Sequence, residues 1–269
     1  MVKKLFKHEF IAWLRTFWVV FLVILTLAGA HRIFQIFEND STAYEVANVL
    51  TIIAYSISLF VAILLPIGFA FSRFYKNLFT GEGYLSLTLP VTAGQHLWTK
   101  TLTATAMSLA TGMVCILSVM LITAGDLFSE ICKAAAYLLG KIPSKQVWHI
   151  VGYCLEALVL IIVSLFSSHI LFDACICLGQ RFRKNRVGAA IGVYFGYYYF
   201  GQLMATIFGV VIEVLEENGT LQPLYDFMDK HGNASIHIGF AVAILLAALQ
   251  ALVCFWVCHR TLTRKLNLE

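Results

Sequence analysis

Six long apolar segments, separated by shorter polar stretches, dominate the pattern along the chain. They lie at residues 17–37, 46–72, 101–124, 147–178, 187–214 and 236–258. About 20 consecutive apolar residues span the hydrocarbon core of a bilayer, so each segment is long enough to cross it. Backbone polar groups in lipid need partners within their own segment, which favours helices. The pattern therefore predicts an all-α integral membrane protein, with six transmembrane helices in one domain over residues 1–269.

The first 17 residues follow a different pattern. Apolar residues recur at helical spacing over residues 2–17, and lysine, histidine and arginine occupy the positions between them. Such a segment is predicted to be an amphipathic helix that lies in the membrane interface, with its cations toward lipid headgroups. The alternative is a cytoplasmic extension of the first transmembrane helix.

The segment 73–100, between the second and third apolar segments, is too regularly patterned for a simple tether. It opens with two cations, carries a single acid between two glycines, and then alternates apolar residues as far as a proline. We interpret this pattern as a docking surface at one face of the membrane. Its candidate docking residues are Glu82, Gly83, Tyr84, Leu85, Leu87, Leu89 and Pro90.

The overall composition and the distribution of charge support these interpretations. The chain is 60% hydrophobic and only 13% charged, whereas soluble domains carry about 25% charged residues. The net charge of +4 is too small and too dispersed for a nucleic-acid partner. Of the 19 lysines and arginines, 14 fall on the side of the termini and of segment 73–100. Because cytoplasmic loops are enriched in these residues, both termini and this segment are expected to be cytoplasmic.

The sequence offers few candidates for catalytic chemistry. It contains no phosphate-binding loop and no zinc-protease motif, so no cofactor or metal site is predicted. Two acids, Glu156 and Asp173, lie inside the fourth apolar segment, and His169 shares a helix face with Asp173. Such residues either line a polar pathway, form a helix contact, or sit near the interface as ordinary carboxylates.

The fifth apolar segment is rich in glycine and tyrosine. Gly188, Gly192 and Gly196 are spaced by four residues, which favours close packing against another helix. Tyr194 and Tyr198 are candidates for lining a pathway, because buried tyrosine hydroxyls need partners.

Residues 79–100 resemble the first cytoplasmic loop of small permease subunits of type-2 ABC transporters from Gram-positive bacteria. The resemblance rests on Glu82-Gly83-Tyr84, on Leu89-Pro90-Val91 and on Lys100. The N-terminal Phe-Lys-His-Glu-Phe at 6–10 and the closing residues 265–269 also look like that family. The resemblance implies a transport subunit of the bacterial plasma membrane that is not itself an enzyme.

The same resemblance implies several partners. ATP would be bound by a separate ATPase subunit, and a short coupling helix within segment 73–100 would seat on that subunit. A second permease subunit, identical or related, would complete the pathway among membrane lipids, and residues 2–17 would form an elbow helix. Export is typical of the family, but no residue here discriminates among peptides, lipids and drugs. The alternatives are a membrane-embedded enzyme and a secondary transporter that works alone.

Overall fold

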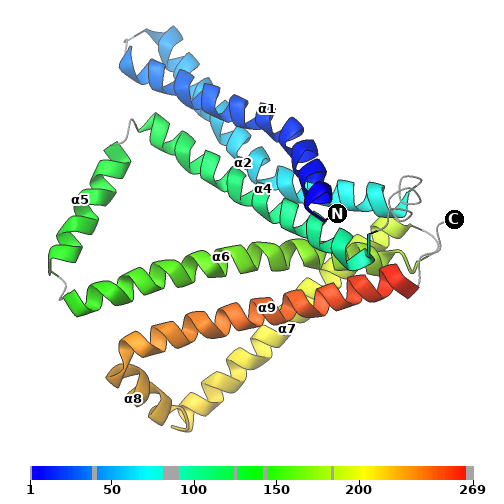
Figure 1. The fold of residues 1–269 in the computed structure, drawn as a ribbon. Coiled ribbons are helices and arrows are strands. Elements are labelled where there is room, and N and C mark those ends of the chain that lie inside the picture. The colour runs from blue at the N-terminus through cyan, green and yellow to red at the C-terminus, as the bar shows by residue number, and fades with distance from the viewer. Residues whose placement is uncertain are drawn as a thin grey trace. The chain divides into compact units, whose positions relative to one another are not determined.

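Helices account for almost all of the chain. The structure is a computed structural model that describes residues 2–37, 41–80, 91–123, 126–141, 144–182 and 185–264. These residues form no strand, and helix makes up 94% of the structure (Figure 1). In chain order the helices are α1 (Val2–Ile36), α2 (Thr42–Phe79), α4 (Ala93–Ile122), α5 (Asp126–Lys141), α6 (Ser144–Gly179), α7 (Arg186–Glu217), α8 (Gln222–Lys230) and α9 (Gly232–Arg264).

Six of the described helices, α1, α2, α4, α6, α7 and α9, are long and apolar enough to cross a membrane. They contain 30 to 38 residues each. At about 1.5 Å per residue they measure roughly 45–57 Å, well beyond a hydrocarbon core of about 30 Å. The predicted all-α class with six membrane-crossing helices is confirmed, and the chain is a multi-pass membrane protein.

The helices continue into the connection that the sequence assigned to residues 73–100. α2 runs on to Phe79, and α4 begins at Ala93 with Thr92 as its N-cap. The Thr92 hydroxyl accepts a hydrogen bond from the Gln95 backbone, while the Gln95 side chain accepts one from Thr92 N–H. This reciprocal capping satisfies two backbone donors at the start of the helix. The connection proper is therefore residues 80–92, of which 81–90 lie outside the described residues.

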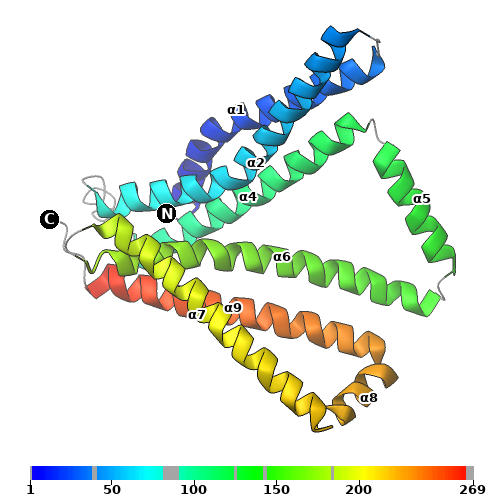
Figure 2. The ribbon, with the colours of Figure 1, turned by 180° about the vertical axis from the view of Figure 1, so that it is seen from behind.

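Contacts within the chain divide it into two compact units, residues 1–147 and 148–269. In the first unit α1, α2 and α4 lie side by side, as both views show, and α5 follows α4 (Figures 1 and 2). The second unit holds nearly all of α6 together with α7, α8 and α9, and α8 packs on α9.

The core of the first unit is aromatic near the N-terminus. Trp13 and Phe17 of α1 are buried with Ala104 and Met107 of α4. The ring of Phe69 on α2 meets Trp13 and Phe17 edge-on, at centroid distances of 4.7 and 5.6 Å. α1 has no break at residue 17. Residues 2–17 are thus continuous with the first long helix, and Phe10, Trp13 and Phe17 pack in the core of the first unit.

α4 contributes buried threonines to the centre of the first unit. Thr101, Thr103, Thr105 and Thr111 are nearly inaccessible, and each hydroxyl donates to the backbone carbonyl four residues earlier. These bonds satisfy the hydroxyls inside an apolar environment. Toward the other end of the unit, the Tyr55 hydroxyl of α2 lies 2.8 Å from the hydroxyl of Ser118 on α4. Polar contacts therefore reinforce the apolar packing between these helices.

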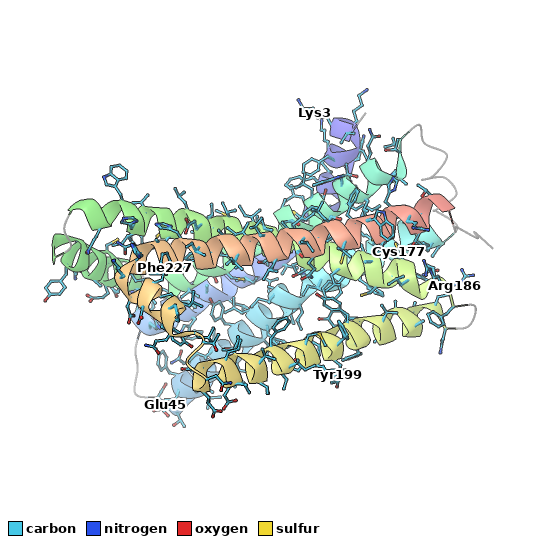
Figure 3. All side chains as sticks on the ribbon, turned by 90° about the horizontal axis from the view of Figure 1, so that it is seen from below. Lys3, Glu45, Cys177, Arg186, Tyr199 and Phe227 are labelled. Carbon is cyan, nitrogen blue, oxygen red and sulfur yellow. The ribbon has the colours of Figure 1, made fainter. Side chains whose placement is uncertain are left out.

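α7 is the most exposed of the long helices. Among its described side chains only Ala190 is buried. It lies beside Gly179, where an added Cβ would come within 2.7 Å of the Ala190 nitrogen. Tyr199 lies on the exposed surface of the helix (Figure 3). Gly192 and Gly196 face open space, so the close packing predicted for this glycine stripe does not occur within the described chain.

Candidate functional site

Three charged side chains from three helices meet around Glu9 of α1. Arg73 of α2 donates to Oε2 of Glu9 at 2.8 Å, and Lys100 of α4 donates to Oε1 at 2.8 Å. Glu9 is only 8% exposed. We call Glu9, Arg73 and Lys100 the ion triad. One carboxylate thereby joins all three long helices of the first unit.

The position of the ion triad follows from the helix ends. Arg73 lies about two turns before the end of α2, and Lys100 lies about two turns after the start of α4. The two cations therefore flank the connection 80–92 on either side. Arg73 also sits over the ring of Phe69, with its guanidinium carbon 5.7 Å from the ring centroid. The aromatic core of α1, α2 and α4 and the ion triad thus form one continuous contact zone.

Burial makes the ion triad sensitive to loss of any member. The Lys100 side chain is 9% exposed and that of Glu9 is 10% exposed, whereas Arg73 retains 27%. Charge-assisted hydrogen bonds of this kind are roughly twice as strong as neutral ones. A buried charge that loses its partner is strongly destabilising, because water does not replace the lost interaction. The ion triad therefore fixes α2 and α4 relative to α1 next to the connection.

The predicted docking residues, Glu82 to Pro90, all lie outside the described residues. Their role remains the prediction made from the sequence. What the structure describes is the frame that carries them: the end of α2, the start of α4, and the N-terminal part of α1 that binds both.

The polar residues predicted within the fourth segment fall into two separate places on α6. Glu156 accepts a hydrogen bond from Nδ1 of His237 on α9 at 2.7 Å. His169 and Asp173 are buried one turn apart, at 4% and 5% exposure. The Cys258 thiol of α9 lies close to Asp173 and to Cys177 of α6. Both places thus join α6 to α9, which fits the helix-contact interpretation. Among the described residues no three or more histidine, cysteine or acidic side chains are arranged to hold a metal ion.

The two predicted tyrosines of α7 differ in environment. Tyr194 is half-buried and stacks on Phe172 of α6, with ring centroids 5.0 Å apart. Tyr198 is 57% exposed and meets its neighbour Tyr199 edge-on at 5.8 Å. Tyr194 is therefore a contact between α6 and α7, whereas Tyr198 belongs to the exposed surface of α7.

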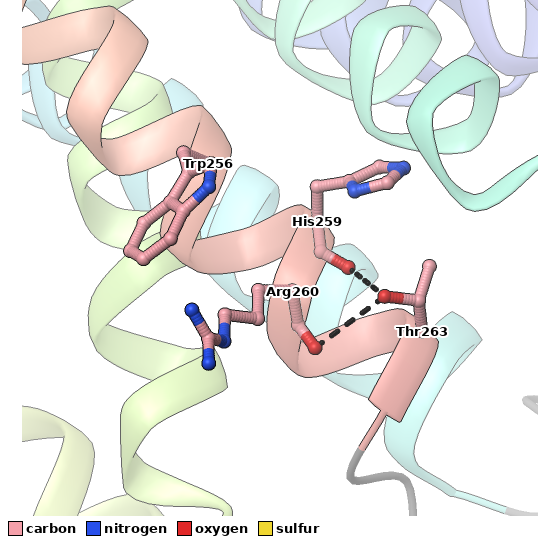
Figure 4. Close-up of a pocket in the computed structure, with 4 residues that line it drawn as sticks. All are labelled: Trp256, His259, Arg260 and Thr263. Carbon is pink, nitrogen blue, oxygen red and sulfur yellow. Dashed lines mark hydrogen bonds between the residues drawn. The ribbon is translucent and has the colours of Figure 1, made fainter.

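A shallow hollow of about 200 Å³ lies near the C-terminal end of α9 (Figure 4). Trp256, His259, Arg260 and Thr263 line it, and the Arg260 guanidinium lies 5.1 Å from the Trp256 ring centroid. The Thr263 hydroxyl donates to the carbonyls of His259 and Arg260. Tryptophan and arginine together at a helix end are typical of the zone where apolar side chains meet lipid headgroups.

The ion triad and the His149–His237 contact of α6 and α9 were not found by sequence reasoning. Glu9 had one distinguishing signal: it is the only acid in the first 37 residues, within a basic helix. Its two partners lie 64 and 91 residues away, so no local spacing connects them. His149 and His237 are 88 residues apart and lie on separate helices, 3.0 Å from one another.

Fold and site together define a helical, multi-pass membrane protein with a buried ion triad at one end of its first three long helices. Comparisons of the sequence with protein-family models and with curated proteins, and a comparison with solved structures, found no match.

Proposed function

We propose that the chain is the membrane-spanning subunit of an ATP-driven transporter and that a separate ATPase docks on its connection 80–92. The observation that supports this most is the ion triad. It ties both helix ends that flank the connection to α1. A protein that moved the connection would therefore displace three packed helices together, rather than bend one loop.

The aromatic core explains how such a displacement would travel. One helical turn from the ion triad, the ring of Phe69 on α2 packs edge-on against the rings of Trp13 and Phe17 on α1. Close-packed interiors have low compressibility and transmit strain, so the three helices respond as one body. ATP would be bound by the partner subunit, and the transport step would follow from the movement of this body within the membrane.

The proposed arrangement places the termini and the connection in the cytoplasm of a bacterial cell. The excess of lysine and arginine on that side of the sequence supports this orientation. A second permease subunit, identical or related, would complete the pathway. The exposed apolar and aromatic surface of α7 is available for membrane lipid or for such a subunit.

Site-specific crosslinking tests the docking directly. A photoreactive phenylalanine analogue replaces Tyr84 in one variant and Phe227 of α8 in a control variant. Both variants are expressed in the cells that naturally make the protein, irradiated, and purified in mild detergent. We expect the Tyr84 variant alone to crosslink to a protein that carries a phosphate-binding loop, as identified by mass spectrometry.

Absence of any nucleotide-binding protein from the crosslinks at Tyr84, in an intact chain, would contradict the docking proposal. A second variant combines Glu82→Ala, Tyr84→Ala and Leu89→Ala. We expect it to lose co-purification of the ATPase while keeping the thermal stability of the wild type. Transport by the purified chain in vesicles with an ion gradient and no ATPase would instead indicate a secondary transporter.

A further inference from the structure

Four residues of α6 and α9 form a polar cluster. The cluster lies toward the N-terminal end of each of these two helices, and the hollow lies at the other end of α9. His149, Tyr153 and Glu156 follow each other on α6 at spacings of four and three residues, so they share one helix face. His237 of α9 faces them near the start of its helix. We call these four residues the histidine cluster.

The histidine cluster contains a continuous chain of hydrogen bonds. Oε1 of Glu156 lies 2.7 Å from Nδ1 of His237, and Nε2 of His237 lies 3.0 Å from Nδ1 of His149. Both nitrogens of the central ring are therefore engaged, one by a carboxylate and one by a second imidazole. The other carboxylate oxygen of Glu156 is buried and accepts no hydrogen bond from the described residues.

The surroundings hold the His237 ring in place. The Tyr153 ring packs on it at 4.6 Å, and the Tyr153 hydroxyl is bonded to the side-chain oxygen of Asn233 at 3.2 Å. Gly152 also lets α6 approach closely, because a Cβ there would lie only 3.1 Å from Cε1 of His237. The ring is therefore oriented by both its bonds and its packing.

With Glu156 ionised and both rings neutral, His237 donates from Nδ1 to the carboxylate and accepts at Nε2 from Nδ1–H of His149. Nε2 of His149 has no hydrogen-bond partner among the described residues. A proton from water can add there. The proton between the rings then shifts to His237, which becomes an imidazolium beside Glu156, and every hydrogen bond survives.

A second proton has no such place on the two rings. It would require N–H groups on both facing nitrogens, His149 Nδ1 and His237 Nε2, and these would repel each other at 3.0 Å. We propose that the histidine cluster is a binding site for one exchangeable proton, taken up at His149 and held as a His237–Glu156 ion pair. The proposal stands apart from the ATPase docking and does not depend on it.

Proton binding at this site acts on the contact between α6 and α9. Before uptake Glu156 carries an uncompensated negative charge, and afterwards the pair Glu156–His237 is neutral overall. The bond from His237 to the carboxylate then has a charged donor as well as a charged acceptor, and the bond between the two rings changes from neutral to charge-assisted, which is the stronger kind. Tyr153 is the other titratable side chain in contact with the rings, while Asp229 and Lys230 of the neighbouring α8 are exposed.

Nitrogen-15 NMR of histidine-labelled protein in lipid nanodiscs tests the proposal. We expect a through-hydrogen-bond coupling between Nδ1 of His149 and Nε2 of His237 on both sides of a single titration step. On acidification Nε2 of His149 gains a proton while its Nδ1 loses one. An ordinary imidazole never shows this opposite change, and exposed His259 serves as the internal reference for ordinary behaviour.

Two matched glycine variants complete the experiment. Gly152→Ala pushes a methyl group against His237, whereas Gly239→Ala on α9 meets open space. We expect loss or marked weakening of the coupling in the first variant and an unchanged coupling in the second. A His149 ring protonated on both nitrogens in acid, or no coupling between the rings in the wild type, would overturn the proposal.

Discussion

Replacing Glu9 by glutamine removes the shared acceptor of the ion triad while keeping the size of the side chain. The variant leaves Lys100, which is 9% exposed, and Arg73, which is 27% exposed, without their counter-charge. Hydrogen bonds to charged groups contribute about 1.5–3 kcal/mol each. Breaking a buried ion pair costs about 3–5 kcal/mol. Arg73 can turn toward water, so we expect a total near 3–5 kcal/mol rather than the sum of both bonds.

Thermal unfolding of the purified chain in detergent, followed by tryptophan fluorescence, measures this loss. Trp13 reports directly, since it is buried in the aromatic core of the same helices. Domains of this size shift Tm by about 2–4 °C per kcal/mol, so Tm should fall by about 6–20 °C. Glu130→Gln is the matched control, because the Glu130–Lys133 pair is 72% exposed at both ends. Exposed pairs contribute little, about 0–1 kcal/mol, so its Tm should move by at most a few degrees.

A Glu9→Gln variant that unfolds at the temperature of the wild type would refute the structural role of the ion triad. A further variant separates the stability of the chain from the transmission of movement between its helices. It combines Glu9→Leu, Arg73→Met and Lys100→Met. Replacing a buried ion network by apolar residues of similar volume is often neutral or stabilising. We expect this variant to recover most of the lost Tm. If it also keeps full ATP-dependent transport, packing alone carries the motion and the ion triad is not needed for it.

Three further predictions follow from the described contacts. Gly179→Ala places a methyl group within 2.8 Å of the α7 backbone, so thermal unfolding should show a loss of stability of about 1–3 kcal/mol. The control Gly192→Ala meets open space and should be neutral or slightly stabilising. Tyr55→Phe removes a buried hydroxyl contact between α2 and α4 and should cost about 0.5–1.5 kcal/mol, whereas Tyr199→Phe on the exposed surface of α7 should cost nothing measurable. Cys132 is exposed on α5, so a membrane-impermeant maleimide added to intact cells should label it, and labelling only after lysis would reverse the proposed orientation.

The long helices could be predicted from the sequence because their signal is local. A run of about 20 apolar residues identifies a membrane-crossing helix without knowledge of its neighbours. The predicted segment 46–72 lies wholly within α2, whereas 101–124 starts eight residues after the beginning of α4 and ends two residues beyond it. The ends of the helices were harder to predict, because polar residues such as Arg73 and Lys76 are typical of loops. In the structure α2 continues through them to Phe79, and Arg73 within the helix has a partner on α1.

The contacts between helices could not be predicted, because they depend on which faces meet. Glu156 was singled out as an acid within the membrane, but its partner His237 lies 81 residues later. The stripe of glycines on α7 was expected to pack, yet Gly192 and Gly196 face open space. A stripe of small residues allows another helix to approach closely, but it does not specify which helix that is.

Helix length explains why the ion triad can exist in so apolar a protein. From the far ends of their helices, Ile36, Thr42 and Ile122, the three charges lie roughly 33–47 Å along the axes at 1.5 Å per residue. With those far ends at one edge of a hydrocarbon core about 30 Å thick, Glu9, Arg73 and Lys100 would fall beyond the other edge. They are buried there by protein rather than by lipid. A partner that engages the connection would therefore act on helix ends that project from the membrane, where the ion triad converts one contact into movement of three helices.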